Sequence, residues 1–385
     1  MFSQSFTIVR TEKTKYKNKK AHPCVTLLSI KGSVRMHESE TKSISEIIHS
    51  TQIQEDMKLE HLVTTLSVEY DDFEAKNIIC EFCLHSSSDK TLKYGMEYFY
   101  LNGYYEELQL LIAKNKESEN ESNRKWAAVY ELSLERYINT KTLQPLSYQH
   151  ILKQADRIKT DEPALICVIE FLKLGVYNQL SEFGPLGNFL DKQPRLFDQV
   201  EDTFLRKSFQ IRLYQTLFMY HWIRNELIVA RKYAFQVLNL SSNVNVVSNI
   251  HINLALTYTF DTYNQGMYHL NEALAIAEKN NLRDNIYSIK NHNIPFLSAH
   301  FKQVEGKEFT TTDNSERAHI EIARGNLEKA KDILRGEKID SPFKQYYLGL
   351  AKQDRDILLK SYTYFIEKRS DYFFSRLPLN VLRHM

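Results

Sequence analysis

Residues 251–334 constrain the fold more than any other stretch, because two helical hairpins can be read directly in them. Each hairpin combines large apolar residues with small ones at helical spacing. The first is marked by Leu254, Ala255 and Tyr258 before the turn and by Tyr263, Gly266, Leu270 and Ala273 after it. The second is marked by Ala318, Gly325, Asn326, Leu327, Ala330 and Leu334. The small residues let two helices approach closely, so the pattern predicts paired antiparallel helices.

A hairpin of this kind cannot bury its apolar face alone, so neighbouring hairpins must stack on it. Three more stretches repeat the pattern, at 94–114, 209–238 and 346–374. The spacing is similar to that of the tetratricopeptide repeat (TPR). We therefore predict an all-α chain that forms a TPR-like right-handed helical solenoid. Its concave surface is expected to bind a partner rather than to carry out chemistry.

The composition agrees with a helical chain of this size. The 385 residues are 43% hydrophobic, enough for a large core, and only 11 glycines and 8 prolines interrupt them. The 50 Lys and Arg face 48 Asp and Glu, a net charge of +2, so any nucleic-acid surface must be local. One stretch, 114–125, has no apolar residue and predicts the clearest exposed loop of the chain.

The first residues lack the apolar core of a signal peptide, and no apolar run approaches the roughly 18 residues that a membrane-spanning helix needs. The longest run, Ala164–Ile169, is interrupted by Glu170. The surrounding segment 163–180 is apolar on nearly all sides, which predicts an interior helix of the stack. We expect a cytoplasmic protein without a membrane partner, in which four cysteines are reduced thiols. They are Cys24, Cys80, Cys83 and Cys167.

The local excess of cations lies at the start of the chain. Residues 1–50 are assigned to a basic head, in which short helical patterns on either side of Gly32 have the outline of a helix-turn-helix. The candidate DNA contacts are Lys17, Lys19, Lys20, Lys31 and Arg35. Two plainer interpretations stay open, a polar leader over residues 11–20 and a small helical cap. Residues 51–385 are assigned to the solenoid.

No motif in the sequence indicates an active site. Cys80 and Cys83 have the spacing of a zinc-binding pair, with His85 beside them, but a structural zinc site needs a second pair and the sequence has none. We therefore interpret them as two core thiols on one face of a helix. His292 and His300 flank a helix break expected at the intervening proline and show no metal-binding or catalytic pattern. We expect no enzyme activity, no metal and no cofactor.

A basic head followed by a TPR-like solenoid resembles the bacterial peptide-pheromone receptors and, within them, the arbitrium receptors (AimR) of temperate phages. The order and spacing of short segments carry the resemblance, from about residue 40 to residue 375. These segments are Lys42–Ile48, Cys83–Leu84, Arg206–Arg212, Ser315–His319, Lys329–Lys331, Tyr346–Leu348 and Tyr364–Phe365, with Asp371 and Phe373. The resemblance implies a receptor that senses a short secreted peptide and thereby decides between lysis and lysogeny.

In that family the solenoid folds round a hexapeptide, and the bound form releases operator DNA. The family's peptide-contacting positions fall on Glu316, Asp340, Asp371 and Phe373. Three carboxylates suit a basic residue or the amino terminus of a peptide, and the phenylalanine suits its apolar part. Carboxylates that face one another repel unless Lys or Arg lies between them, so ordinary solvated charges are the alternative. Two further family contacts, an asparagine and an arginine, are replaced here by Met219 and Asn245.

Three functions stay open on this reasoning. The first is a transcription regulator that binds DNA through its head and a short peptide in the solenoid groove. The second is a peptide-gated, protein-binding TPR module of the Rap type. The third is a diverged paralogue that has lost DNA binding, peptide binding or both. Because the tail after Phe373 is shorter than the family's dimer-forming helix, a homodimer is expected to be weak or to use another surface.

Overall fold

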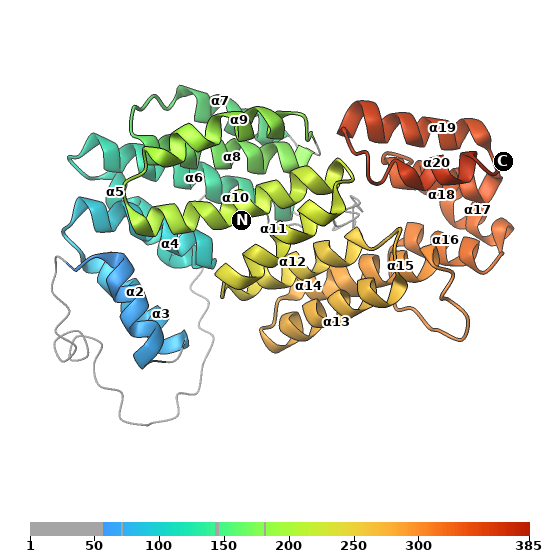
Figure 1. Ribbon diagram of the computed structural model, residues 1–385, viewed down its shortest axis with the longest axis horizontal. Helices are drawn as coiled ribbons and strands as arrows, with labels where there is room; N and C mark the ends of the chain where they lie inside the picture. Colours follow the sequence, from blue (N-terminus) through green and yellow to red (C-terminus); the bar gives the residue numbers. More distant parts are fainter. Residues whose placement is uncertain (1–56, 71, 143–145, 181) are drawn as a thin grey trace, which may run out of the picture.

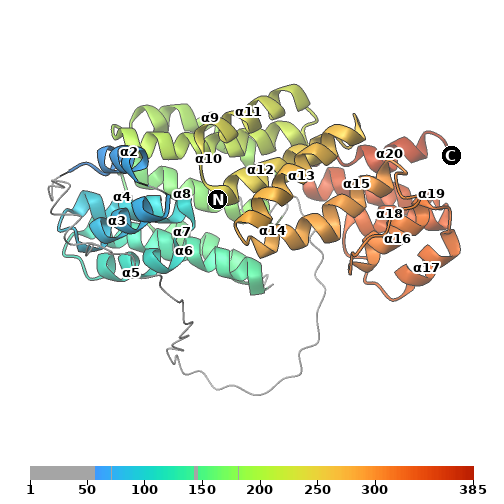
Figure 2. The ribbon, with the colours of Figure 1, turned by 90° about the horizontal axis from the view of Figure 1, so that it is seen from below.

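The structure is a computed structural model that describes residues 57–70, 72–142, 146–180 and 182–385. Over these residues it is helical and contains no strand. The predicted head, residues 1–50, and its boundary with the solenoid lie outside this range. The α2–α5 end and the α17–α20 end lie at opposite ends of the long axis in Figure 1 and Figure 2, and helix α10 runs across the middle between them.

Most helices follow one another as antiparallel neighbours joined by short turns, and two segments, η1 and η2, are π-helical. In chain order they are α2 (Leu59–Glu69), α3 (Asp72–His85), α4 (Asp89–Asn102), α5 (Tyr105–Lys116), α6 (Glu121–Thr142), α7 (Leu146–Arg157), α8 (Pro163–Leu180), α9 (Pro185–Asp198), α10 (Thr203–Ile223), α11 (Leu227–Leu240), α12 (Val244–Thr257), α13 (Tyr263–Lys279), α14 (Arg283–Ser288), η1 (Ile289–Asn293), α15 (Ile294–His300), α16 (Asn314–Ala323), α17 (Leu327–Arg335), α18 (Pro342–Lys352), α19 (Arg355–Thr363), η2 (Tyr364–Lys368) and α20 (Arg376–Leu382).

Both hairpins predicted within 251–334 are present. In the first, α12 packs against α13, and Ala255 and Ala273 are completely buried. Gly266 is required by the close approach, because a Cβ there would lie 3.2 Å from the Ala255 carbonyl oxygen. In the second, Gly325 takes a φ of 84° in the turn, and Ala330 is completely buried in α17. The prediction of an all-α, TPR-like helical solenoid is confirmed.

The exposed loop predicted over 114–125 is only partly correct, because much of the stretch is exposed but most of it is helical. Helices α5 and α6 continue into this stretch and leave only residues 117–120 between them. Asn115 and Asn123 are completely buried, and the Asn123 amide donates to the Asn115 side-chain oxygen at 3.0 Å. Asn123 also donates to the Asp89 carboxylate at 3.0 Å. Asn115 and Asn123 can occupy core positions, where apolar residues would be expected, because their amide N–H groups are hydrogen-bonded inside the stack.

Helix α8 is the interior helix that the sequence predicts. It is the one described helix that is long and apolar enough, by length and composition alone, to cross a membrane. A core helix passes the same test. Its apolar side chains pack against α6, α7, α9 and α10, and Leu165, Cys167 and Val176 are completely buried.

The helix made of α14, η1 and α15 continues past Pro295 through a π-helical turn. Proline has no N–H, and its ring excludes the carbonyl group four residues back, here that of Asn291. The turn widens, so the Ile294 N–H donates to the Ile289 oxygen five residues back. The Asn291 oxygen instead accepts a hydrogen bond of 2.6 Å from the Thr311 hydroxyl. The helix break expected here is therefore a bulge in a continuous helix.

Candidate functional site

Glu316 lies in the first turn of α16 and is completely buried. The Asp313 side chain caps this helix by accepting from the Ser315 and Glu316 backbone N–H groups, both at 2.9 Å. The Tyr347 hydroxyl donates to Glu316, with the two carboxylate oxygens 3.1 and 3.4 Å away. The His319 ring stacks on Tyr347 at a centroid distance of 4.3 Å. The Glu316 carboxylate is thus held between helices α16 and α18.

Asp340 lies in the turn between α17 and α18 and is half-buried. The partner of its carboxylate is a lysine of the same chain, because Lys344 Nζ lies 3.4 Å from Asp340 Oδ1. Lys344 is almost completely buried and also lies 3.5 Å from the Glu337 carboxylate and 3.1 Å from the Lys338 carbonyl oxygen. A buried ammonium group needs such acceptors, and Asp340 supplies one of the three.

Asp371 is completely buried and follows Ser370, which has a left-handed φ of 53°. One carboxylate oxygen accepts from the Phe374 backbone N–H at 2.9 Å, and the other oxygen has no hydrogen-bond partner. Burial raises the pKa of this carboxyl group from 3.8 to about 6, against the opposing effect of the Arg369 guanidinium. A buried carboxyl group with one open oxygen is the strongest binding feature among the four predicted residues.

Phe373 packs inside an aromatic cluster and is completely buried. Its ring centroid lies against those of three others, Phe374 at 4.9 Å, Phe260 at 5.1 Å and Trp222 at 5.9 Å. Phe296 extends the cluster from Phe374 to the His319 ring, 5.8 Å away, next to Glu316. The structure therefore brings Glu316, Asp371 and Phe373 to one cluster and leaves only Asp340, among the four predicted residues, partly exposed.

Three buried amide side chains were not identified from the sequence. Gln215 in α10, Asn253 in α12 and Asn293 in η1 are 4%, 5% and 0% exposed. Neither polar atom of the Asn293 amide has a hydrogen-bond partner, and the side-chain oxygens of Gln215 and Asn253 have none. Native interiors rarely leave such groups unpaired, so they are candidates to bond a ligand's main chain. The sequence signal is an isolated amide within an otherwise apolar stretch, as in 250–256.

The prediction that Cys80 and Cys83 are core thiols on one helix is confirmed. Both lie in α3 and are buried as free cysteines. Burial raises the pKa of Cys80 to about 12 and raises that of Cys83 as well, so both thiols are protonated at neutral pH. His85 is exposed and pairs with Glu81. Within the described ranges no three His, Cys, Asp or Glu side chains gather to hold a metal ion.

The remaining predicted residues divide into two groups. The candidate DNA contacts lie outside the described residues: Lys17, Lys19, Lys20, Lys31 and Arg35. The two positions that replace family contacts are both described. Met219 is buried in α10, and the Asn245 N–H donates at 2.8 Å to the Asn243 side chain that caps α12. Neither side chain supplies the positive charge of the arginine that the family has.

The stacked hairpins form a TPR-like helical solenoid. Residues 75–384 match the model of the AimR transcriptional regulator-like family, so the chain belongs to that family. The resemblance found in the sequence is confirmed. The family consists of arbitrium receptors and transcription regulators and is not a family of enzymes.

Known relatives are distant in sequence. A solved structure of phAimR with a ligand superposes with a TM-score of 0.71 at 22% identity and covers 86% of this chain and 98% of that one. A structure of selenomethionine phAimR gives a TM-score of 0.61 at 20% identity, covering 84% of each chain. The uncharacterized Bacillus anthracis protein pXO2-35 is 24% identical over 241 residues, which is 60% of this chain and 87% of that protein. At these identities the two structures establish the fold.

Proposed function

We propose that this chain is a cytoplasmic, peptide-responsive transcription regulator of the phage lysis–lysogeny type. It binds operator DNA through residues 1–50 and a short peptide inside the solenoid. Membership of the AimR family over residues 75–384 supports this proposal. The observation that carries the peptide part is a set of buried amide atoms without hydrogen-bond partners: the side-chain oxygens of Gln215 and Asn253 and both polar atoms of the Asn293 amide.

The charges in the C-terminal half favour a basic peptide. The amides hold the peptide main chain, and Asp371, through its open oxygen, holds a basic residue or the amino terminus. Glu316 adds a second carboxylate once it exchanges its hydrogen bond from Tyr347 for one from the ligand. Asp340 lies at the partly exposed side, and Phe373 supports the apolar part of the peptide from within the aromatic cluster.

Titration calorimetry with synthetic hexapeptides tests the peptide part. The probe is a pool of peptides that each carry one arginine, compared with the same pool carrying citrulline, the neutral isostere. We expect the arginine pool to bind more tightly. Glu316→Gln and Asp371→Asn should each weaken binding by roughly 30- to 1,000-fold, because a desolvated charge pair contributes about 2–4 kcal/mol.

The matched control is Glu121→Gln, which removes an exposed carboxylate paired with Lys125 at 2.8 Å. It should bind peptide as the wild type does. Asn293→Ala should weaken binding by about tenfold, the value of one interior hydrogen bond. Equal affinities in all these proteins would refute the proposed site.

Salt dependence tests the DNA part. For duplex DNA from the promoter region next to the encoding gene, the logarithm of the affinity should fall linearly with the logarithm of the salt concentration. Replacing Lys17, Lys19, Lys20, Lys31 and Arg35 with Gln should flatten the slope by about 4 to 5, since each phosphate contact contributes about 0.9. An unchanged slope would show that these five residues do not contact DNA phosphates. Binding to a protein partner that changes little with salt would indicate the Rap-type alternative. A chain that binds neither DNA nor peptide would be the diverged paralogue.

The proposed regulator forms a homodimer through the outer face of α19 and η2. A shallow surface cavity of about 420 Å³ lies there, lined by Asp356, Leu359, Lys360, Thr363, Tyr364, Glu367 and Lys368. Leu359 is 52% exposed. Because acids and bases alternate along the face, two antiparallel copies place opposite charges across a two-fold axis. Sedimentation velocity should show a dimer that Leu359→Glu converts to a monomer, and a wild-type monomer at all concentrations contradicts this surface.

A further inference from the structure

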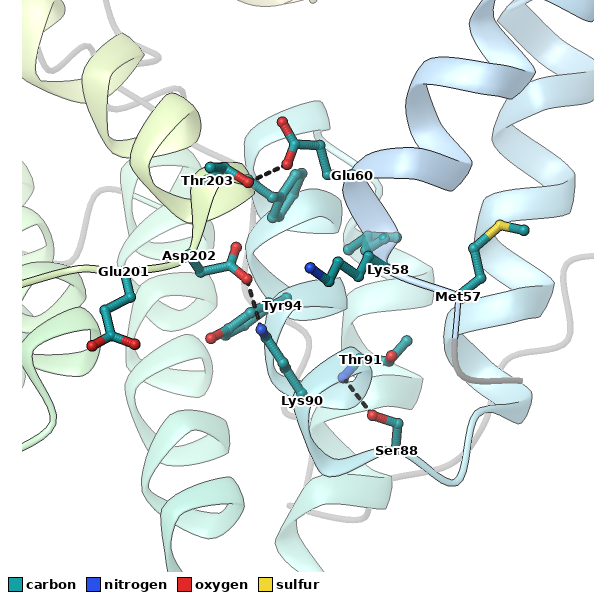
Figure 3. Close-up of a pocket in the computed structure, with 12 residues that line it drawn as sticks. Met57, Lys58, Glu60, Ser88, Lys90, Thr91, Tyr94, Glu201, Asp202 and Thr203 are labelled. Atoms are coloured by element: carbon teal, nitrogen blue, oxygen red, sulfur yellow. Dashed lines mark hydrogen bonds and ion pairs between the residues drawn. The ribbon is translucent and has the colours of Figure 1, made fainter. Parts of the chain in front are cut away.

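Three helices begin around one cavity, which lies between α2, α4 and α10 and has a volume of about 320 Å³ (Figure 3). The Ser88 side chain caps α4 by accepting from the Thr91 N–H, and the Asp202 side chain caps α10 by accepting from the Leu205 N–H. Lys58 stands at the start of α2 and points into the cavity (Figure 3). The first turn of α2 therefore borders the cavity, although Leu59 in the same turn is buried in the core.

Polar contacts hold α2 over this cavity. The Glu60 carboxylate accepts from the Thr203 hydroxyl and lies 2.6 Å from Lys207 Nζ, so it joins α2 to the first turns of α10. Lys90, at the start of α4, pairs with Asp202 at 2.9 Å and fixes the same end of α10 (Figure 3). Further along α2, Leu62 and Leu66 are buried and anchor the helix by packing. Glu60 therefore ties the first turn of α2 to α10 by polar contacts, beside the packing of Leu59.

The other end of α10 is held by the C-terminal segment 371–376. The carbonyl oxygen of Ile223, the last residue of α10, accepts from the Tyr372 N–H at 2.8 Å and the Phe373 N–H at 3.1 Å. Arg376 donates to the Asn225 side chain at 2.9 Å, just beyond the helix. These bonds satisfy a carbonyl group that a helix end leaves unpaired.

One rigid helix therefore connects three places. Helix α10 has 21 residues and is about 31 Å long at 1.5 Å per residue. Its first turns hold Glu60 of α2, its middle carries the unpaired side-chain oxygen of Gln215, and its last residue binds the segment that contains Asp371. Helix α2 is the first described helix after residues 1–56, which carry the candidate DNA contacts.

We propose that α10 couples the C-terminal segment 371–376 to α2. In this proposal, the contacts of Glu60 with α10 transmit a displacement of α10 to α2. A displacement at Ile223 moves α10 along its length and repositions the first turn of α2 over the cavity. One part of this proposal rests on the proposed function, namely that the coupling carries the state of the peptide site to the head. The coupling between the two ends of α10 is independent of that function, so it can be tested without a ligand.

Hydrogen exchange of the α2 amides, in the full chain without peptide or DNA, tests the coupling. Arg376→Ala and, separately, Phe373→Leu loosen the distal end of α10. We expect each to change the exchange rates of residues 59–69 by at least about threefold, beyond the roughly twofold scatter of independent distant sites. In a Glu60→Gln background the same changes should leave these rates within about twofold.

Glu121→Gln is the matched background, since it removes an exposed carboxylate that does not reach α10. In that background the threefold response should persist. Exchange in α7, in which no residue is substituted, should stay unchanged in every variant, which shows that the solenoid remains folded. The proposal is overturned if neither distal change affects α2, or if both affect it equally with and without Glu60. Failure of peptide binding would alter none of these outcomes.

Discussion

Two of the completely buried carboxyl groups, those of Glu97 and Asp371, are stabilised differently. Glu97, in α4, accepts a hydrogen bond from the Tyr130 hydroxyl and lies 2.7 Å from the Arg212 guanidinium. The Asp371 carboxylate accepts the Phe374 backbone N–H at 2.9 Å, and its other oxygen has no hydrogen-bond partner. The Arg369 guanidinium lowers the pKa of Asp371, but by less than burial raises it.

The surroundings of Glu97 are built for a permanent ion pair. The Arg212 guanidinium lies over the Tyr100 ring at 4.9 Å, and Arg136 donates to the Tyr100 hydroxyl at 2.7 Å. Gly175 leaves room for Arg136, because a Cβ there would lie 3.0 Å from the guanidinium carbon. Glycine within a helix costs about 1 kcal/mol relative to alanine. Helix α8 is therefore less stable with Gly175 than it would be with alanine, but the glycine makes room for the Arg136 side chain. Each of the two carboxyl groups has one oxygen without a hydrogen-bond partner, so the difference between them lies in the cation. The direct contact of Glu97 with Arg212 indicates a structural ion pair, whereas the Phe374 N–H that Asp371 accepts leaves its charge available to a ligand.

The largest expected effect breaks the Glu97 pair. Arg212→Met keeps much of the side-chain volume and leaves a buried carboxylate without its cation, which should lower the free energy of unfolding by about 3–5 kcal/mol. Urea denaturation measures this loss. The double variant Arg212→Met with Glu97→Gln should recover part of it, because no isolated charge then remains. A loss below about 1 kcal/mol for the single variant would show that the pair is not structural.

A pH-dependent effect of intermediate size is expected at Asp371. Its folded pKa is raised to about 6, above the unfolded value near 3.8, so the native state binds this proton more tightly. The penalty for burying the charge is therefore present above pH 6 and disappears as the pH falls toward 4. Asp371→Asn should stabilise the protein by about 1–3 kcal/mol at pH 7 and by little at pH 4. Thermal unfolding between pH 4 and 7 checks this, and a pH-independent difference contradicts the assignment.

The smallest effect is expected at Asp340. Its side chain is 27% exposed, and Lys344 keeps the Glu337 carboxylate and the Lys338 carbonyl oxygen when Asp340 is lost. Asp340→Asn should therefore change the free energy of unfolding by less than about 1 kcal/mol. Urea denaturation at 50 mM and 500 mM salt would show whether the residual effect is screened. A larger loss would place Asp340 with Glu97 among the structural carboxylates.

The hairpins were predictable because their signals are local. Ala255 with Gly266, and Ala330 after Gly325, mark close helix approaches within a few residues of a turn, and the structure places them there. The apolar composition of 163–180 likewise fixed an interior helix. The helical part of 114–125 was missed because the hydrogen bonds that bury its asparagines reach helix α4, and no pattern within the stretch reveals that partner.

The site was less predictable because its contacts join distant parts of the chain. Phe373 matches a peptide-contacting position of the family, yet its N–H bonds to Ile223 and its ring packs on Trp222. Lys344 shows no sign in the sequence of being buried, although it supplies the cation that a structural role for Asp340 requires. Asn293 is identified only once its lack of any partner is known.

The π-helical turn at η1 makes the packing of the helices sensitive to the number of residues in the segment 289–293. A π turn holds an extra residue, so the helix after Pro295 is rotated by about 100° relative to an uninterrupted α-helix. That rotation sets which face of α15 carries Phe296 into the aromatic cluster while Asn293 stays in the layer beside α12. A surface loop would tolerate the deletion of a single residue. The same deletion within 289–293 would rotate either the Asn293 amide or the Phe296 ring away from its present position.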